Sequence, residues 1–294
     1  MLATVMAIGG LFGLFGKPEP IPPKPVWPAA PGPVKAAKPL VVESARVTRL
    51  PARVRDLGTI PWKVVEYGTP ALHVKADRAT VQGFFWRGSM EGVHVGSGPF
   101  TPAGMRQKHR PIRVTLDDLW CDDVGEDAIE IHPRARVTVR HAKIRGNHRL
   151  LPTHDADVRG LDKLVQIDSA DIVFEDCDFF NGVSAVRAKA NSTVTLRRCR
   201  FIDCSTCVSG DGLACPRPSN PYDNGQPGPC RITLIDCEAW DCHLVARAYQ
   251  GCEIRIVGGK WHNSRPARED GGSIRFFRYL KTGQTPPTGR KQAP

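Results

Sequence analysis

The ten residues from Asp122 to Ile131 read DDVGEDAIEI and contain five carboxylates, although the whole chain has a formal net charge of +11. Carboxylates this close together repel one another, which favours a bound cation between them or the protonation of one of them. Ca²⁺ suits such a place, because it accepts carboxylate oxygens, carbonyl oxygens and water in irregular geometry. The stretch is therefore a candidate cation site, and the alternative is an acidic turn that water solvates.

A repeat of about 22 residues determines which elements carry this stretch. The segments IVFEDCDFFNG, VTLRRCRFIDC and ITLIDCEAWDC begin at Ile172, Val194 and Ile232 and align without gaps, and segments beginning at residues 79, 114, 137 and 254 fit the same frame. Within each segment apolar and polar residues alternate, which is typical of β-strands, and the longer intervals contain loop-like insertions, as in solenoids. The sequence predicts an all-β parallel β-helix of about seven or eight turns over residues 46–280. A leucine-rich repeat can share the period, but its Leu and Asn ladder is absent.

The repeat also predicts which polar residues lie on neighbouring turns, about 4.8 Å apart. Counting from the segment starts places seven of them in one patch: Glu91, Glu126, Asp127, Asp162, Lys163, Ser184 and Arg187. A cationic neighbourhood pushes Lys163 toward the neutral amine, which is a general base, and Arg187 can hold an acidic substrate group in a bidentate pair. These parts suit abstraction of a proton alpha to a carboxylate. The alternative is a ladder of surface charges that stabilises the sheets modestly.

Three motifs of the chain resemble those of the pectate lyases of polysaccharide lyase family three. They are MEGVHV (90–95), DDVGEDA (122–128) and ADVRGLDKLVQI (156–167), and the similarity covers roughly residues 75–210. The resemblance implies a compact right-handed parallel β-helix that uses Ca²⁺. It also implies β-elimination of an acidic polysaccharide, either polygalacturonate or another polyuronate.

The same resemblance implies a role for each residue of the patch. Three acids would hold the calcium ion, namely Glu91, Glu126 and Asp127. Lys163 would be the base, with Asp162 beside it, and Arg187 would bind substrate. Two positions depart from the family, since Glu91 replaces an aspartate and Ser184 replaces a second lysine. A degenerate relative that only binds polysaccharide is therefore the alternative to an enzyme.

The chain has ten cysteines, nine of them after residue 170. In the repeat frame Cys177 and Cys199 stack in one interior column and Cys204 stacks with Cys242, while Cys215 and Cys230 bracket an insertion. These six are disulfide candidates if the protein is extracellular or secreted, and reduced core thiols are the alternative. Seven of the nine histidines, at positions 94, 132, 141, 148, 154, 243 and 262, show no convincing metal-ligand spacing and are expected to be ordinary surface or core residues.

The two ends of the chain differ in composition from the repeats. Residues 1–16 are apolar and resemble an anchor or signal segment, residues 17–45 are a proline-rich spacer, and residues 281–294 form a basic tail. This organisation suggests a second hypothesis, a structural virion component such as a tail spike, fibre or capsid decoration protein. Such a protein would lie on the virion surface and would join a larger virion or surface assembly through residues 1–40. It could also form oligomers. A nucleic-acid partner is not expected, because aromatic residues make up only 7% of the chain and the sequence contains no recognised nucleic-acid-binding motif.

Overall fold

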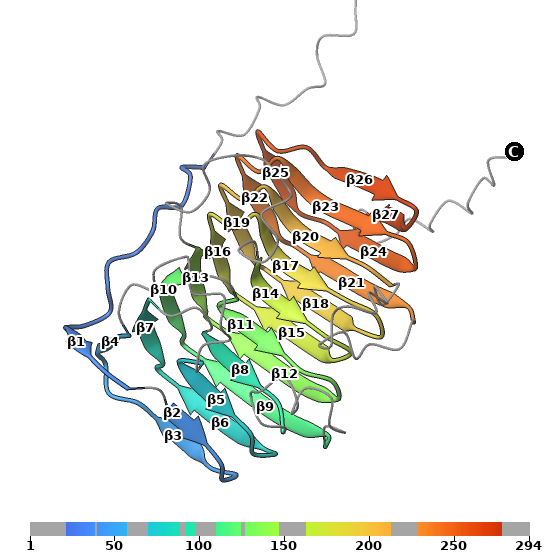
Figure 1. The fold of residues 1–294 in the computed structure, drawn as a ribbon. Coiled ribbons are helices and arrows are strands. Elements are labelled where there is room, and N and C mark those ends of the chain that lie inside the picture. Colours follow the sequence, from blue (N-terminus) through green and yellow to red (C-terminus); the bar gives the residue numbers. More distant parts are fainter. Residues whose placement is uncertain are drawn as a thin grey trace, which may run out of the picture.

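The computed structural model describes residues 22–38, 40–57, 70–88, 92–97, 110–124, 127–146, 163–212 and 228–277. All helix or strand structure in these residues is β-strand, and the strands form three nine-stranded parallel sheets, A, B and C. The chain visits the sheets in turn, so that each turn adds one strand to every sheet (Figure 1). The protein is a right-handed parallel β-helix, as the sequence predicts.

The strands are short, and within each sheet they lie side by side in the order in which they occur along the chain. Sheet A contains β1 (Val34–Ala36), β4 (Val54–Asp56), β7 (Phe85–Arg87), β10 (Trp120–Val124), β13 (Lys143–Gly146), β16 (Asp178–Phe180), β19 (Arg200–Ile202), β22 (Glu238–Trp240) and β25 (Lys260–His262). Sheet B contains β2 (Leu40–Val42), β5 (Leu72–Val74), β8 (Val93–Val95), β11 (Ile129–Ile131), β14 (Lys163–Ile167), β17 (Ser184–Ala188), β20 (Thr206–Gly210), β23 (Leu244–Tyr249) and β26 (Ala267–Asp270). Sheet C contains β3 (Val47–Arg49), β6 (Ala79–Gln82), β9 (Ile112–Asp117), β12 (Ala135–Arg140), β15 (Asp171–Glu175), β18 (Thr193–Arg197), β21 (Cys230–Ile235), β24 (Cys252–Val257) and β27 (Ser273–Phe277).

The repeat frame is confirmed residue for residue in sheet C. The seven segment starts pair in register: Ala79, Val114, Val137, Ile172, Val194, Ile232 and Ile254. The described residues make nine turns, more than the expected seven or eight, because the sheets extend beyond these seven segments at both ends. The first turn begins at Val34, inside the segment that the sequence assigns to the spacer.

Single residues with positive φ form the corners between the sheets. Between sheets C and A this position is occupied by Gly83, Asp118, His141, Asp176, Arg198, Asp236 and Gly258. One left-handed residue turns the chain sharply, and Gly, Asn and Asp adopt this conformation at the lowest cost. Alternate apolar residues of all three sheets consequently face one narrow interior, where Phe179 and Phe201 stack with ring centroids 5.2 Å apart.

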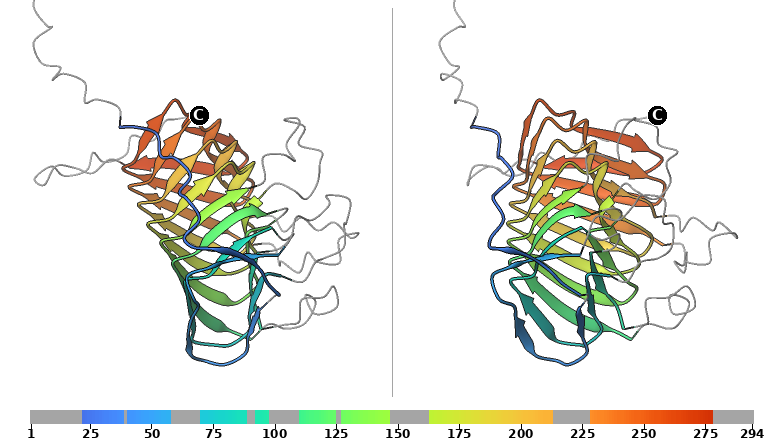
Figure 2. Two further views of the ribbon diagram at one scale, coloured as in Figure 1. Left: turned by 90° about the vertical axis from the view of Figure 1, so that its left-hand side faces the viewer. Right: turned by 60° about the vertical axis from the view of Figure 1, so that its left-hand side comes forward.

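The proline-rich segment lies against the body of the protein over its described residues. Residues 22–33 run along the outer face of sheet A (Figures 1 and 2). The Trp27 ring lies 5.3 Å from that of Trp120 and 5.1 Å from that of Phe180. Lys24 forms ion pairs of 2.6 Å with Asp203 and Asp241. This part of the expected spacer therefore covers an apolar stripe of sheet A.

The two terminal segments of the sequence analysis, residues 1–16 and 281–294, lie outside the described residues. Among the residues that are described, no helix is long and apolar enough to cross a membrane.

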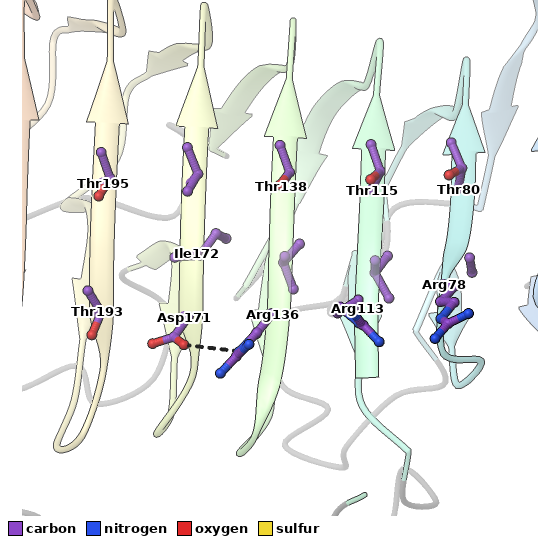
Figure 3. Close-up of a pocket in the computed structure, with 14 residues that line it drawn as sticks. Arg78, Thr80, Arg113, Thr115, Arg136, Thr138, Asp171, Ile172, Thr193 and Thr195 are labelled. Atoms are coloured by element: carbon purple, nitrogen blue, oxygen red, sulfur yellow. Dashed lines mark ion pairs between the residues drawn. The ribbon is translucent and has the colours of Figure 1, made fainter. Parts of the chain in front are cut away.

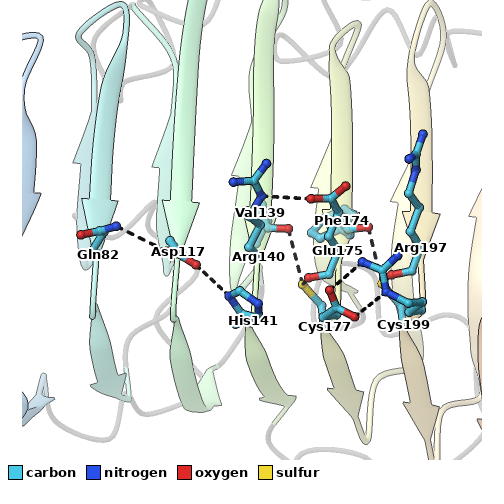
Figure 4. Close-up of polar contacts among 12 residues, drawn as sticks. Gln82, Asp117, Val139, Arg140, His141, Phe174, Glu175, Cys177, Arg197 and Cys199 are labelled. Carbon is cyan, nitrogen blue, oxygen red and sulfur yellow. Dashed lines mark hydrogen bonds and ion pairs between the residues drawn. The ribbon is translucent and has the colours of Figure 1, made fainter.

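The disulfide expectation is not supported, because all nine described cysteines are free, buried thiols. In-register neighbours stack about 4.8 Å apart with parallel side chains, whereas a disulfide needs Cβ atoms about 3.5–4.5 Å apart. Each stacked thiol instead donates to a carbonyl oxygen of another turn: Cys177 to Val139 at 3.6 Å and Cys199 to Phe174 at 3.7 Å (Figure 4).

The described cysteines of the remaining candidate pairs are also free thiols that donate to carbonyl oxygens. Cys204 donates to Phe179 at 3.7 Å, Cys242 to Phe201 at 3.6 Å and Cys230 to Ala188 at 3.7 Å, and Cys215 lies outside the described residues. Burial raises the pKa of the Cys204 and Cys207 thiols well above the ordinary value. Both are therefore unreactive core residues.

Candidate functional site

A continuous row of polar side chains crosses the outer face of sheet B. We call it the sheet B row, and it consists of His73, His94, Glu130, Gln166, Arg187, Ser209 and Arg247, which pair in register from β5 to β23. Their flanking strand residues, such as Val93 and Val95, belong to the core. Since side chains alternate between the two faces of a strand, the row faces outward.

The N-terminal half of the row is buried although it faces outward. His94 and Glu130 are only 2% and 6% exposed, and His73 and Gln166 are also buried. Polar groups lose hydration when they are buried, which costs free energy unless protein partners replace the water. A row of desolvated titratable groups on one face is thus a candidate functional site.

Gln166 connects the groups at the centre of this face. Its Oε1 accepts a hydrogen bond of 2.7 Å from Lys163 Nζ, and its Nε2 donates to Glu130 Oε1 at 3.4 Å and Asp168 Oδ2 at 3.5 Å. Lys189 Nζ lies 3.2 Å from Asp168 Oδ1. Positive and negative groups therefore alternate across β11, β14 and the end of β17.

Asp127 is a buried carboxylate with a strongly perturbed pKa near this face. It is 3% exposed, and its Oδ1 has no hydrogen-bond partner among the described residues. Burial raises its pKa to about 6, although the positive charges of Lys163, Lys189 and Arg187 oppose the shift. The buried carboxylate therefore lies within electrostatic reach of three cationic side chains.

The structure brings together four of the predicted site residues, Asp127, Lys163, Ser184 and Arg187, on the outer face of sheet B. Its register differs by one residue from the counted one: Lys163 pairs with Ser184, whereas the count places Ser184 beside Asp162. Arg187 pairs with Gln166, and the Ser184 hydroxyl shares a hydrogen bond of 2.9 Å with the Ser209 hydroxyl.

The predicted calcium site can be compared with the structure at one ligand only. Glu91, Glu126 and Asp162 lie outside the described residues. The buried Asp127 Oδ1, with no hydrogen-bond partner among the described residues, is suited to ligate a cation. The described neighbours of Asp127 that act on its charge include three cations and one acid, Asp168, so they supply little of a calcium-binding set by themselves.

Sequence reasoning missed a second cluster, formed by His94, Glu130 and His132. His94 Nε2 lies 3.5 Å from Glu130 Oε2, and His132 Nε2 lies 3.9 Å from Glu130 Oε1. The expectation that the histidines lack metal-ligand spacing is wrong for this pair, because one ligand atom of each of the three residues lies within 4.8 Å of the others. The signal was the in-register alignment of VHV (93–95) with IEI (129–131), followed directly by a histidine.

The outer face of sheet C carries a different pattern. A shallow groove of about 540 Å³ is lined there by Thr80, Thr115, Thr138 and Thr195 together with arginines such as Arg113 and Arg136 (Figure 3). Along its other edge Asp117 binds His141 at 2.9 Å and Arg140 binds Glu175 at 3.0 Å (Figure 4). These are solvated ladders of the kind that the charge-ladder alternative describes.

Comparison with known proteins gives likenesses among solved structures. No protein-family model matches the chain, and no curated protein matches it. Among solved structures, the alginate lyase from Paenibacillus sp. str. FPU-7 superposes with a TM-score of 0.48 and 12% sequence identity, covering 82% of this chain and 86% of that one.

Proposed function

We propose that the outer face of sheet B binds an acidic polysaccharide and cleaves it by β-elimination, in the manner of a pectate lyase of polysaccharide lyase family three. The observation that carries the proposal is the set of three cations, Lys163, Lys189 and Arg187, around buried Asp127. Cationic groups in a desolvated setting attract a polyanion strongly. The basic composition of the chain supports the same substrate class.

In the proposed reaction Lys163 acts as the general base. After its ammonium group has released a proton to solvent, its amine takes the proton from the carbon alpha to a uronate carboxylate, and the electron pair of that C–H bond forms a carbon–carbon double bond. The bond from the neighbouring carbon to the glycosidic oxygen breaks, and the departing oxygen takes a proton from solvent. The products are an unsaturated uronate and a shorter chain with a free hydroxyl group.

The neighbouring side chains have distinct tasks in this proposal. Arg187 forms a bidentate pair with the substrate carboxylate and stabilises the negative charge that develops on it. Gln166 positions Lys163, since its Oε1 accepts the lysine's 2.7 Å hydrogen bond. A Ca²⁺ ion held by Asp127 with Glu91 and Glu126 would supply further charge stabilisation at the carboxylate.

Binding without cleavage is the second candidate, and one observation favours it. The family's second lysine is replaced by Ser184, and the Ser184 hydroxyl is engaged by Ser209 rather than free for a substrate. Such a protein would retain the cationic face but turn over slowly or not at all.

The experiment is a measurement of ultraviolet absorbance with polygalacturonate and other polyuronates, each with added Ca²⁺ and with EDTA. Elimination creates an unsaturated product, so the proposal predicts a steady rise with at least one substrate. Affinity electrophoresis in gels containing the same polymers separates the two candidates. Retardation without an absorbance rise indicates binding alone, and the absence of both contradicts the proposal.

A further inference from the structure

We propose that His94, Glu130 and His132 bind one transition-metal ion of the zinc type. This site is separate from the predicted calcium acids and does not depend on the proposed lyase function. It lies on the same outer face of sheet B, on β8, β11 and the residue that follows β11.

The fold itself brings the three side chains together. His94 and Glu130 are in-register neighbours on adjacent parallel strands, and His132 follows Glu130 by two residues. The two imidazole Nε2 atoms flank the carboxylate, at 3.5 Å from Oε2 and 3.9 Å from Oε1. Tetrahedral zinc with bonds of about 2.0–2.1 Å separates its ligand atoms by about 3.3 Å. Small side-chain rotations thus suffice to close the three ligands on one ion.

The donor set selects the class of metal. Two imidazoles and one carboxylate are the ligands of Zn²⁺, Co²⁺ and Fe²⁺, whereas Ca²⁺ and Mg²⁺ prefer oxygen atoms only. Three protein ligands leave a fourth position, which is typical of a site where water or substrate binds.

The groups around the three ligands hold them in place. Gln166 Nε2 donates to Glu130 Oε1 at 3.4 Å, and such outer contacts orient the ligands of metal sites. The His73 ring packs beside the His94 ring with centroids 5.0 Å apart, and His73 Nε2 donates to the Gly96 carbonyl at 3.2 Å.

Gly96 provides the space that His132 occupies. A Cβ at position 96 would lie 2.8 Å from His132 Cβ and 3.0 Å from two of its ring atoms. Any other residue would force the His132 ring to move.

A metal-free ion-pair cluster is the rival account. It would place up to two imidazolium charges around one carboxylate at positions that are no more than 6% exposed. A metal replaces these protons, so the two accounts predict different metal content and different spectra.

The experiment uses the full chain, stripped with EDTA, incubated with Zn²⁺ or Co²⁺ and freed of unbound metal. We expect one Zn²⁺ or Co²⁺ per chain by elemental analysis, and a visible Co²⁺ spectrum of low coordination number that excess Ca²⁺ does not abolish. Retention of no metal, or a Co²⁺ spectrum like that of the hydrated ion, would overturn the site.

Variants assign the metal to these residues. His94→Gln with His132→Gln should abolish retention, whereas His141→Gln with His243→Gln, at exposed histidines, should leave it unchanged. Gln166→Ala should weaken affinity by about 10- to 100-fold without removing the metal. Full retention by a folded His94→Gln/His132→Gln protein would overturn the assignment. If that protein does not fold, the wild-type stoichiometry and spectrum decide.

Discussion

The outer faces of sheets B and C use the same backbone and the same stacking, yet they treat charge in opposite ways. On sheet C the ion pair of Arg136 with Asp171 spans 3.5 Å, and its side chains are 73% and 54% exposed (Figure 3). On sheet B, Glu130 and Asp127 are almost completely buried. Exposed pairs cost little to keep and contribute little, whereas buried charges cost stability. The difference supports the proposal that sheet B, rather than sheet C, carries the functional site.

The largest expected effect separates two lysines that are both partly exposed, Lys163 and Lys143. Lys163→Ala should lower the turnover number about 10²- to 10⁴-fold, because the general base is lost. Lys143→Ala, on the outer face of sheet A, should leave turnover unchanged. Initial rates of ultraviolet absorbance with the best polyuronate measure both. Equal rates for the two variants would remove Lys163 from the mechanism.

The second effect is a pH dependence of stability whose sign should differ between the two sheets. Burial raises the pKa of Asp127 to about 6, so the folded state is favoured while this carboxyl is protonated. That stabilisation is complete below the ordinary pKa of 3.8 and is lost as the pH rises through about 6. Its size is at most about 3 kcal/mol, since one pKa unit corresponds to about 1.4 kcal/mol.

Urea unfolding at pH 4 to 7 in EDTA, with wild type and Asp127→Asn compared, measures this loss. The variant should lack the part of the decline that Asp127 causes. Asp176, on the sheet C side, behaves oppositely: the hydrogen bonds from Arg198 lower its pKa. Asp176→Asn should therefore lower stability at neutral pH, and its difference from wild type should disappear as the pH falls through the lowered pKa, where wild type loses this contribution. Identical pH profiles for wild type and Asp127→Asn would contradict the burial argument.

The third effect concerns substrate binding by arginines. Arg187→Ala should lower kcat/KM about 10- to 100-fold, because a charge-assisted hydrogen bond contributes about 1.5–3 kcal/mol. The change should appear in kcat as well as in KM, because Arg187 binds the substrate carboxylate and also stabilises the charge that develops on it in the transition state. Arg113→Ala in the sheet C groove is the matched change, and a comparable loss there would move the binding face to sheet C.

The smallest effect is expected on sheet C. A double-mutant cycle of Arg136→Ala and Asp171→Ala should give a coupling below about 1 kcal/mol, and added salt should reduce it further. Thermal unfolding of the four proteins measures the coupling. A coupling free energy of several kcal/mol would mean that ion pairs on the outer face of sheet C contribute substantially to stability. The contrast between exposed charges on sheet C and buried charges on sheet B would then fail.

Sheet C was predictable to the residue, but sheet B was not. The apolar first residues of the repeat segments lie in sheet C and define its register directly. Positions in sheet B are reached only by counting from these residues through connections of variable length. Strand β10 itself contains an extra residue: its pairing with β13 shifts register between Cys121 and Val124, and Asp123 has a φ of 59°. Every later residue of that turn is displaced by one.

That single residue decides which face Glu130 occupies, because a one-residue slip exchanges the two faces of a strand. Counting without it aligns Glu130 with Val95, which faces the core, whereas the structure pairs Glu130 with His94. Counting within the repeat frame therefore could not predict that His94, Glu130 and His132 lie together. In the same way the corner between β14 and β15 is one residue shorter than that between β17 and β18, which is why Lys163 meets Ser184.

The most direct test of the functional difference between the two faces is a crystal structure of the Lys163→Ala protein with an oligogalacturonate. The account predicts sugar density across β14 and β17, with a uronate carboxylate bound by the guanidinium of Arg187. Density in the threonine-lined groove of sheet C, with the face of sheet B empty, would contradict it.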